Sequence, residues 1–179
     1  VFCINARNDL GVKRLMEFIA NVCPAPNKLP AHVNKEGTEI KCDPNGKPSL
    51  FVFKTSIEEH IGEVCYFKVL SGTLTESIDM YNPKTNTKER LSTLFVNAGK
   101  NRVKVDKMYA GDIGATVKLK GTKTGATLVA PGEDWEMPAI KWPNPKYRVA
   151  IKAVTEGDDE KLGEALNKLK DDDQTILVE

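Results

Sequence analysis

Short apolar runs between residues 50 and 128, each ended by glycine or polar residues, constrain the fold more than any other feature. The runs are rich in Val, Ile, Phe and Tyr, and no helical periodicity connects them. Several short strands at this spacing predict an all-β sandwich or barrel. Glycine suits the bends and tight turns of such a fold, where a side chain would clash. The predicted strands are Leu50–Phe53, Val64–Leu70, Ile78–Tyr81, Leu91–Val96, Val103–Val105 and Ile113–Leu119.

A strand and a helix are predicted before the barrel. Val1–Ile4 is an apolar run typical of a fully buried strand. Apolar residues at helical spacing predict a helix over Val12–Val22, capped by Asn8 or Asp9. Residues 27–48 are rich in proline and glycine and indicate a linker, with one strand near Thr38–Lys41.

A strand, a helix and a second strand are predicted after the barrel. Residues 131–147 form a proline-rich linker. Residues 147–154 alternate like a strand, and a helix capped by Asp158 or Asp159 follows. The run Thr175–Val178 begins a further strand.

Charge is distributed unevenly along the 179 residues, although the net charge is only +1. Residues 84–123 hold ten Lys and Arg against three acids, while residues 156–179 hold nine acids against three Lys. A basic middle suggests a polyanionic partner, and an ordinary solvated face is the alternative. The sequence has no run of 18 apolar residues and no signal-peptide pattern, so we expect neither a membrane span nor secretion.

Cysteine and histidine form no metal-binding pattern. The cysteines have no Cys-x-x-Cys pair, and the chain has only two histidines, so we expect no metal site. Free thiols acting as small buried apolar groups are the simplest expectation for the cysteines, and surface imidazoles for the histidines. The residues concerned are Cys3, Cys23, Cys42, Cys65, His32 and His60.

Seven short motifs occur in order along the predicted barrel. They are Phe53-Lys54, Gly62-Glu63-Val64, Lys68 to Leu74, Asn82 to Arg90, Lys100-Asn101-Arg102, Ala110 to Ile113, and Thr124 to Leu128. Their order and spacing resemble the second domain of translation elongation factor G and its relatives. Lys68 replaces the family's usual Arg, Leu70 its Tyr and Ala126 its Asp, which indicates a divergent paralogue. Residues Gly72, Arg90, Gly111, Asp112 and Gly125 are expected to be structural parts of the barrel motif.

The resemblance extends to both flanks. The N-terminal strand and helix resemble the end of the family's GTP-binding domain, with Asn5, Ala6 and Arg7 at the place of its guanine-binding loop. The C-terminal segment resembles the first part of the ferredoxin-like third domain. The expected domains are 1–27 (GTP-binding domain remnant), 28–130 (β-barrel), 131–147 (linker) and 148–179 (partial βαβ). The first residue is Val, which suggests a fragment of a longer protein.

GTP chemistry is expected only in the parent protein. The sequence contains no Gly-x-x-x-x-Gly-Lys-Ser/Thr to hold phosphates. The segments Asp43–Gly46 and Gly121–Gly125 are interpreted as turns. We therefore expect no catalytic residue, cofactor or GTP hydrolysis in this fragment, with GTP and Mg²⁺ bound by the parent.

The resemblance implies a fragment of a cytoplasmic translational GTPase that acts in ribosomal translocation. Its expected partners are small-subunit ribosomal RNA and proteins and the GTP-binding domain of the same chain, with no membrane or DNA. A tetracycline-resistance-type ribosomal protection protein, or a β-barrel protein-interaction module without an RNA role, are the alternatives. The candidates for contact with ribosomal RNA are Lys100, Arg102, Lys104, Lys118, Lys120 and Lys123, with solvated side chains as the alternative for each.

Overall fold

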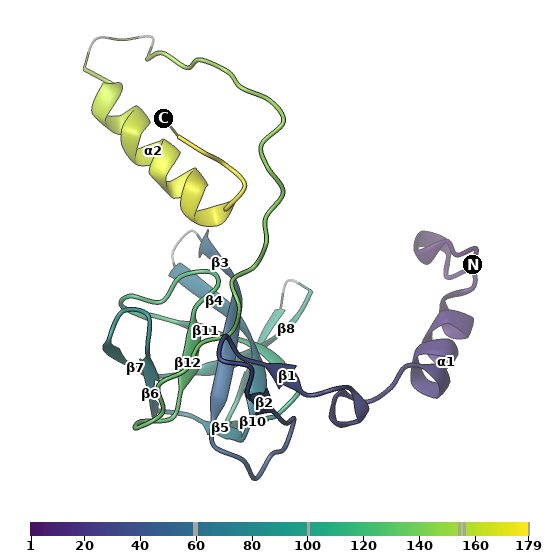
Figure 1. Cartoon of the computed structure of the whole chain (residues 1–179). Coiled ribbons are helices and arrows are strands. Elements are labelled where there is room, and N and C mark those ends of the chain that lie inside the picture. Colours follow the sequence, from purple (N-terminus) through teal and green to yellow (C-terminus); the bar gives the residue numbers. More distant parts are fainter. Residues whose placement is uncertain (59–60, 100, 154, 156, 179) are drawn as a thin grey trace. The chain divides into compact units, whose positions relative to one another are not determined.

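In the computed structural model the chain forms two units, and all of the named strands lie in the second unit. The structure describes residues 1–58, 61–99, 101–153, 155 and 157–178 (Figure 1). Contacts divide it into Val1–Pro30, which is helical, and Ala31–Glu179, which contains the strands and a C-terminal helix. His60 and Lys100 lie outside the described residues.

One α-helix between two short 3-10 turns makes up the N-terminal unit. The 3-10 turn η1 spans Ala6–Asn8, the helix α1 spans Val12–Val22 and η2 spans Pro26–Lys28. The predicted helix and its bounds are confirmed. The helix ends where the chain enters a segment with two prolines, which lack the N–H that a helix interior requires.

Gly11, and not a polar side chain, precedes the first turn of α1. Its φ of 74° is left-handed, and a Cβ there would lie 2.9 Å from the carbonyl oxygen of Cys3. The predicted cap by Asn8 or Asp9 is therefore wrong. Asn8 closes η1, and Asp9 is the left-handed C-cap of η1 with a φ of 54°.

The run Val1–Ile4 is exposed and forms no strand, so the prediction of a buried strand is wrong. A strand needs a hydrogen-bonding partner, and no described strand pairs with this run. Its one ring contact places Phe2 against Phe18 of α1, with 4.9 Å between the ring centroids.

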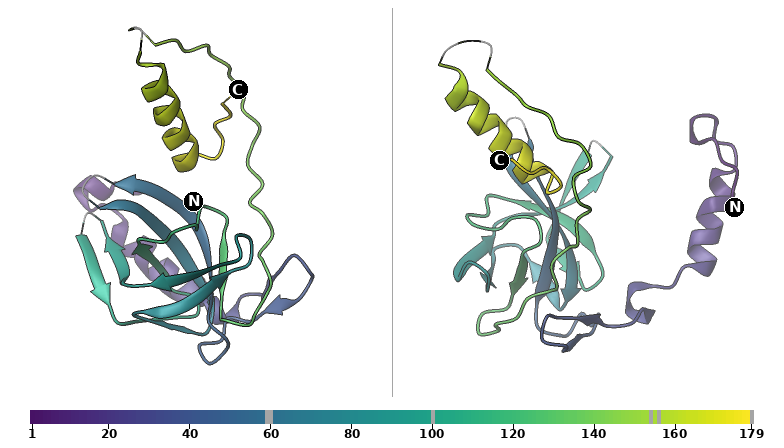
Figure 2. Two further views of the ribbon diagram at one scale, coloured as in Figure 1. Left: turned by 90° about the vertical axis from the view of Figure 1, so that its left-hand side faces the viewer. Right: turned by 45° about the horizontal axis from the view of Figure 1, so that its top comes forward.

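An eight-stranded antiparallel sheet forms the predicted barrel (Figures 1 and 2). Its strand order is β7-β6-β12-β3-β4-β11-β8-β9, and a separate ladder pairs β5 with β10. The mainly β fold class is confirmed. The bounds are β3 Ser49–Glu58, β4 Gly62–Ser71, β5 Thr73–Thr75, β6 Ile78–Asn82, β7 Thr87–Leu91, β8 Leu94–Ala98, β9 Asn101–Val105, β10 Lys107–Tyr109, β11 Ile113–Val117 and β12 Thr127–Val129.

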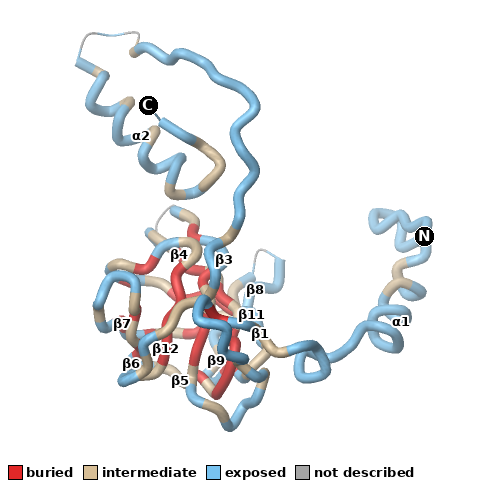
Figure 3. The backbone as a smooth tube through the Cα atoms, in the orientation of Figure 1, coloured by how far each residue is buried: buried red, intermediate tan, exposed pale blue. Residues whose placement is uncertain are grey.

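Alternating apolar side chains of these strands fill one core. In Figure 3 the backbone of buried residues is red and lies in the strands. On β4, Cys65, Phe67 and Val69 point into the core because side chains two residues apart share a face. Each large apolar side chain buried in this way stabilises the fold by about 1.5–3 kcal/mol relative to exposure. The other core members are Leu50, Val52, Leu74, Met80, Leu91, Leu94, Met108, Leu119 and Leu128.

The predicted strand Leu91–Val96 is divided in the structure. β7 ends at Leu91 and β8 begins at Leu94, and both leucines are fully buried. β7 pairs with β6 at one end of the strand order, whereas β8 pairs with β9 and β11 at the other. Over only two residues, the chain therefore passes between strands at opposite ends of the strand order, and the apolar pattern alone does not reveal this change of partner.

A two-stranded hairpin, β1 (His32–Val33) with β2 (Glu39–Ile40), precedes the barrel and confirms the strand predicted near Thr38. His32 Nε2 lies 3.3 Å from Lys68 Nζ of β4, and the ring is half-buried. The prediction of a surface imidazole is wrong for His32, because this contact holds it against the barrel. Burial, and then the charge of Lys68, lower the pKa of His32.

The C-terminal segment contains the predicted helix but not the predicted strands. α2 spans Asp159–Asp172 after Asp158, whose side chain makes no cap hydrogen bond. The described residues of 147–153 and 175–178 belong to no strand. A strand requires a paired neighbour, and the described chain supplies none here, so only the helix of the three predicted elements forms.

Cys65 is the one cysteine that behaves as a buried apolar group. Burial raises the pKa of its thiol to about 12. All four cysteines are free, but Cys3 and Cys23 are exposed and Cys42 is half-buried, so the expectation of burial is wrong for these three. Within the described chain, no helix has the length and apolar character needed to cross a membrane.

Candidate nucleic-acid interface

The described basic candidates lie on two elements of the barrel. Arg102 and Lys104 lie on β9, an edge strand, and Lys118, Lys120 and Lys123 lie in the connection between β11 and β12. The structure also determines which of these cations have acidic partners.

Arg102 forms an ion pair with Glu58, the last residue of β3. Its Nη2 lies 2.6 Å from both carboxylate oxygens of Glu58, and the hydroxyl of Tyr66 donates to the same carboxylate at 2.8 Å. The hydrogen bond from Arg102 and then that from Tyr66 lower the pKa of Glu58. The hydrogen bond to Glu58 raises the pKa of Arg102. The Arg102 side chain is only 20% exposed, so this pair is less screened than the other ion pairs of the site.

Lys104 and Lys123 also have acidic partners. Lys104 Nζ lies 2.8 Å from Glu76, whose hydrogen bond raises the pKa of Lys104. Lys123 Nζ lies 3.1 Å from Glu63 and 3.1 Å from Asp171 of α2. Burial opposes the charge of Lys123, but the bonds to these two carboxylates outweigh it and raise its pKa. Both lysines are about half exposed, so each pair adds little stability.

Lys118 and Lys120 are exposed and flank the buried Leu119. Leu119 points into the core, so the lysines on either side of it are directed outward. Within the described part of the chain, no carboxylate oxygen lies within 4.0 Å of either ammonium group. Lys118 has a left-handed φ of 64°, which explains why β11 ends at Val117 and not at the predicted Leu119.

Glu89 is a buried residue of the Asn82–Arg90 motif to which the sequence analysis assigns no role. It lies on β7 with 2% exposure, and its carboxylate accepts hydrogen bonds from the backbone N–H groups of Lys120 and Gly121. The signal available in the sequence is the strand alternation. If Lys88 and Arg90 face solvent, the residue between them must face inward.

Gly72 and Gly125 of the expected barrel motif occupy turns with left-handed backbone, φ 75° and 85°. Ala126 N donates to the carbonyl of Lys123, so Gly125 is the third residue of a four-residue turn, as expected for the Gly121–Gly125 segment.

The remaining motif residues lie at a second turn and on β7. Gly111 has a φ of 97°, and its N–H donates to Val69. The Asp112 carboxylate accepts from the N–H of Tyr109 at 2.7 Å, which closes the same turn. Arg90 is exposed and lies opposite Asp79 in the β6–β7 ladder.

The guanine-loop candidates are exposed in the N-terminal unit. Ala6 and Arg7 form η1, and the Asn5 side chain accepts a hydrogen bond from the N–H of Asn8 at 3.3 Å. The Asn5 carboxamide therefore serves as a local cap.

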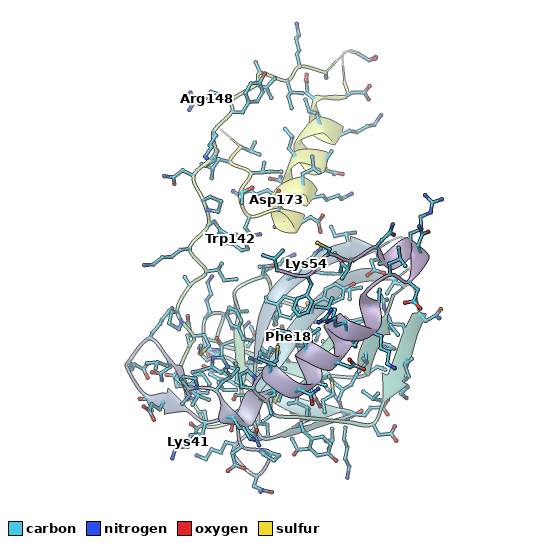
Figure 4. All side chains as sticks on the ribbon, turned by 90° about the vertical axis from the view of Figure 1, so that its right-hand side faces the viewer. Phe18, Lys41, Lys54, Trp142, Arg148 and Asp173 are labelled. Atoms are coloured by element: carbon cyan, nitrogen blue, oxygen red, sulfur yellow. The ribbon has the colours of Figure 1, made fainter. Side chains whose placement is uncertain are left out.

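A pocket of ≈ 220 Å³ lies between β3, the proline-rich linker and the end of α2. Lys54, Trp142 and Asp173 contribute to its walls (Figure 4). Trp142 borders this pocket but remains 44% exposed. None of the basic candidates lines this pocket.

The fold places residues 47–130 in the class of small antiparallel β-barrels. Residues 47–130 match the model of the family described as elongation factor G domain 2. Residues 47–130 therefore resemble elongation factor G domain 2, and the predicted resemblance of the chain to the elongation factor G family is confirmed.

A solved structure supports the same assignment over more of the chain. A crystal structure of a protein from Thermus thermophilus is similar to 98% of this chain, with 27% sequence identity and a TM-score of 0.78. The chain spans 25% of the length of that protein. The similarity thus extends beyond the matched barrel into both flanking segments.

Proposed function

We propose that this chain is part of an elongation-factor-G-like translational GTPase and that its barrel docks on the phosphate backbone of small-subunit ribosomal RNA. The match of residues 47–130 to elongation factor G domain 2 carries this proposal. Contacts to phosphate would fix the orientation of the barrel without reading sequence. In the parent protein, this docking would support movement of tRNA and mRNA through the ribosome in the cytoplasm.

Lys118 and Lys120 are the leading phosphate contacts in this proposal. A phosphate that approached Arg102 would first have to displace Glu58, and Glu63 and Asp171 compete in the same way for Lys123. The two exposed lysines meet no such competitor among the described residues. Arg102, Lys104, Lys123 and Lys100 remain secondary candidates in this proposal.

GTP and Mg²⁺ would be bound by the GTP-binding domain of the same parent, which would also pack on the barrel. Asn5, Ala6 and Arg7 could at most contribute to the guanine end of that site, because the sequence has no phosphate loop. No step of GTP hydrolysis is assigned to residues of this chain.

Substitution of both leading lysines tests the proposal. The variant Lys118→Ala/Lys120→Ala should lower the affinity for small ribosomal subunits by at least about tenfold, or roughly 1.4 kcal/mol. Alanine retains a Cβ, so the left-handed backbone at position 118 is equally strained in both proteins. Co-sedimentation with small subunits at constant low salt measures the effect.

The control removes two exposed lysines from coil segments outside the barrel strands, in Lys41→Ala/Lys141→Ala. This pair changes the net charge equally and should alter affinity by no more than about twofold. Equal losses of affinity in the two double variants would show that Lys118 and Lys120 act only through the net charge of the chain. No effect of either would favour a protein-interaction module without an RNA role.

A further inference from the structure

Glu89 is a carboxylate enclosed by the barrel, and its ligands all come from one loop. Oε2 accepts from Lys120 N at 3.0 Å, and Oε1 accepts from Gly121 N at 2.8 Å and from the Thr122 hydroxyl at 2.9 Å. Within the described chain, no side-chain nitrogen of a Lys, Arg or His lies within 4.0 Å of this carboxylate. Burial of a charge is costly unless hydrogen bonds compensate it, and here loop donors supply the compensation.

A second layer connects the same loop to the β6–β7 hairpin. Thr122 is 1% exposed and Asn82 is fully buried. Asn82 Nδ2 donates to the Thr122 hydroxyl at 3.3 Å, while the Asn82 carbonyl oxygen accepts from Lys84 N at 3.1 Å. The hydroxyl of Thr122 therefore accepts a hydrogen bond from Asn82 and donates its one O–H to Glu89.

The loop is held at two points on either side of Lys120. Leu119 anchors it in the core, and Glu89 binds the backbone N–H groups of Lys120 and Gly121 and the side-chain hydroxyl of Thr122. These bonds fix the backbone of the loop at Lys120, two residues after Lys118. The exposed cations Lys84, Lys88 and Arg90 belong to the same hairpin as Glu89.

We propose that Glu89 is a positioning residue for RNA binding: it holds the loop of residues 118–122 so that Lys118 and Lys120 meet adjacent phosphates of a nucleic-acid backbone. This inference rests on the proposed function and assigns a role to a residue that would never touch RNA. Two preordered lysines lose less conformational entropy on binding than two lysines on a mobile loop.

The variant Glu89→Gln tests this role. Gln has nearly the same size, but an NH₂ donor replaces one of the two acceptor oxygens of Glu89. This NH₂ group would then face a hydrogen-bond donor of the loop. We expect about tenfold weaker binding of the chain to small ribosomal subunits at low salt. We also expect a shallower salt dependence, by about 0.7–0.9 in log–log slope for each phosphate that the variant no longer binds.

A double-mutant cycle with Lys118→Ala/Lys120→Ala separates positioning from general damage. If Glu89 acts through these lysines, the combined variant should bind no more weakly than the lysine variant alone. Met108→Ala, in the core on β10, serves as the control for destabilisation, and it should preserve the salt slope. Thr122→Val removes the hydroxyl link but retains the two backbone bonds of Glu89, and it should lower the slope less than Glu89→Gln.

The outcomes distinguish the two proposals. An unchanged slope in both Glu89→Gln and Thr122→Val, together with a reduced slope in the lysine variant, would overturn the role of Glu89 and leave the RNA interface intact. An unchanged slope in the lysine variant would overturn the proposed interface and with it the role of Glu89. If Glu89→Gln fails to fold, the slope of Thr122→Val decides.

Discussion

Gly72 shows at the scale of one residue why the barrel motif demands glycine. Its φ is 75°, and a Cβ at this position would lie 2.6 Å from both Cα and N of Pro48 and 2.8 Å from the carbonyl oxygen of Gly46. The backbone conformation and the neighbouring backbone therefore both exclude a side chain. Gly125 has a similar φ of 85°, but nothing lies within 4 Å of its Cβ position.

These two glycines give a matched test. Gly125→Ala should cost only the left-handed strain, about 1–2 kcal/mol. Gly72→Ala should cost at least about 1 kcal/mol more, because backbone atoms of residues 46 and 48 would have to move. Urea unfolding of both variants and the parent chain, compared at a common m-value, measures the difference. Equal destabilisation would mean that the contacts at Gly72 relax at no cost.

At the scale of elements, an ion pair ties the edge strand β9 to the end of β3. Arg102 and Glu58 are 44 residues apart in sequence, and the Tyr66 hydroxyl of β4 binds the same carboxylate. Asn97 of β8 donates to the Tyr66 hydroxyl at 3.4 Å, so β3, β4, β8 and β9 share one polar cluster. An edge strand fixed in this way is less available for pairing with other chains.

The polar cluster predicts a dependence of stability on pH. The pKa of Glu58 is lowered in the folded chain, so the pair stabilises the fold above the unfolded pKa and loses this effect as pH falls through the folded pKa. Glu58→Gln should therefore destabilise the chain by about 1 kcal/mol at pH 7, and the difference should shrink below about pH 4.

Unfolding free energies from pH 7 to acid measure this effect, with Glu39→Gln on the exposed hairpin as the control. The control should stay close to the parent chain throughout. A destabilisation by Glu58→Gln that is the same at every pH would show that its cause is packing and not charge.

The strands of the barrel could be predicted from local sequence patterns, whereas the acidic partners of its Arg and Lys side chains could not. Strand alternation and turn glycines are encoded within a few residues, as for Phe67 and Gly125. The acids that neutralise Arg102 and Lys123 come from segments 44 and 60 residues away, so only the folded chain brings them together. Val1–Ile4 failed as a strand for the related reason that pairing depends on a distant partner.

At the scale of the whole molecule, the C-terminal helix is linked to the barrel through Lys123. This lysine bridges Glu63 of β4 and Asp171 of α2, and the Thr55 hydroxyl donates to the carbonyl oxygen of Asp171 at 3.4 Å. Lys123 is thus engaged within the chain, whereas Lys118 and Lys120 have no acidic partner within 4.0 Å among the described residues. The match to elongation factor G domain 2 makes ribosomal RNA the partner that we propose for these two lysines.

The salt dependence of binding between the chain and small ribosomal subunits tests this central claim most directly. Each phosphate contact adds about 0.7–0.9 to the slope of log affinity against log salt, so two lysine contacts predict a slope of about −1.5 or steeper. Co-sedimentation between about 50 and 200 mM salt covers the range in which this effect is large. A slope of that size would support docking on the RNA backbone. Binding that does not change with salt would contradict it and assign the barrel to contacts with protein.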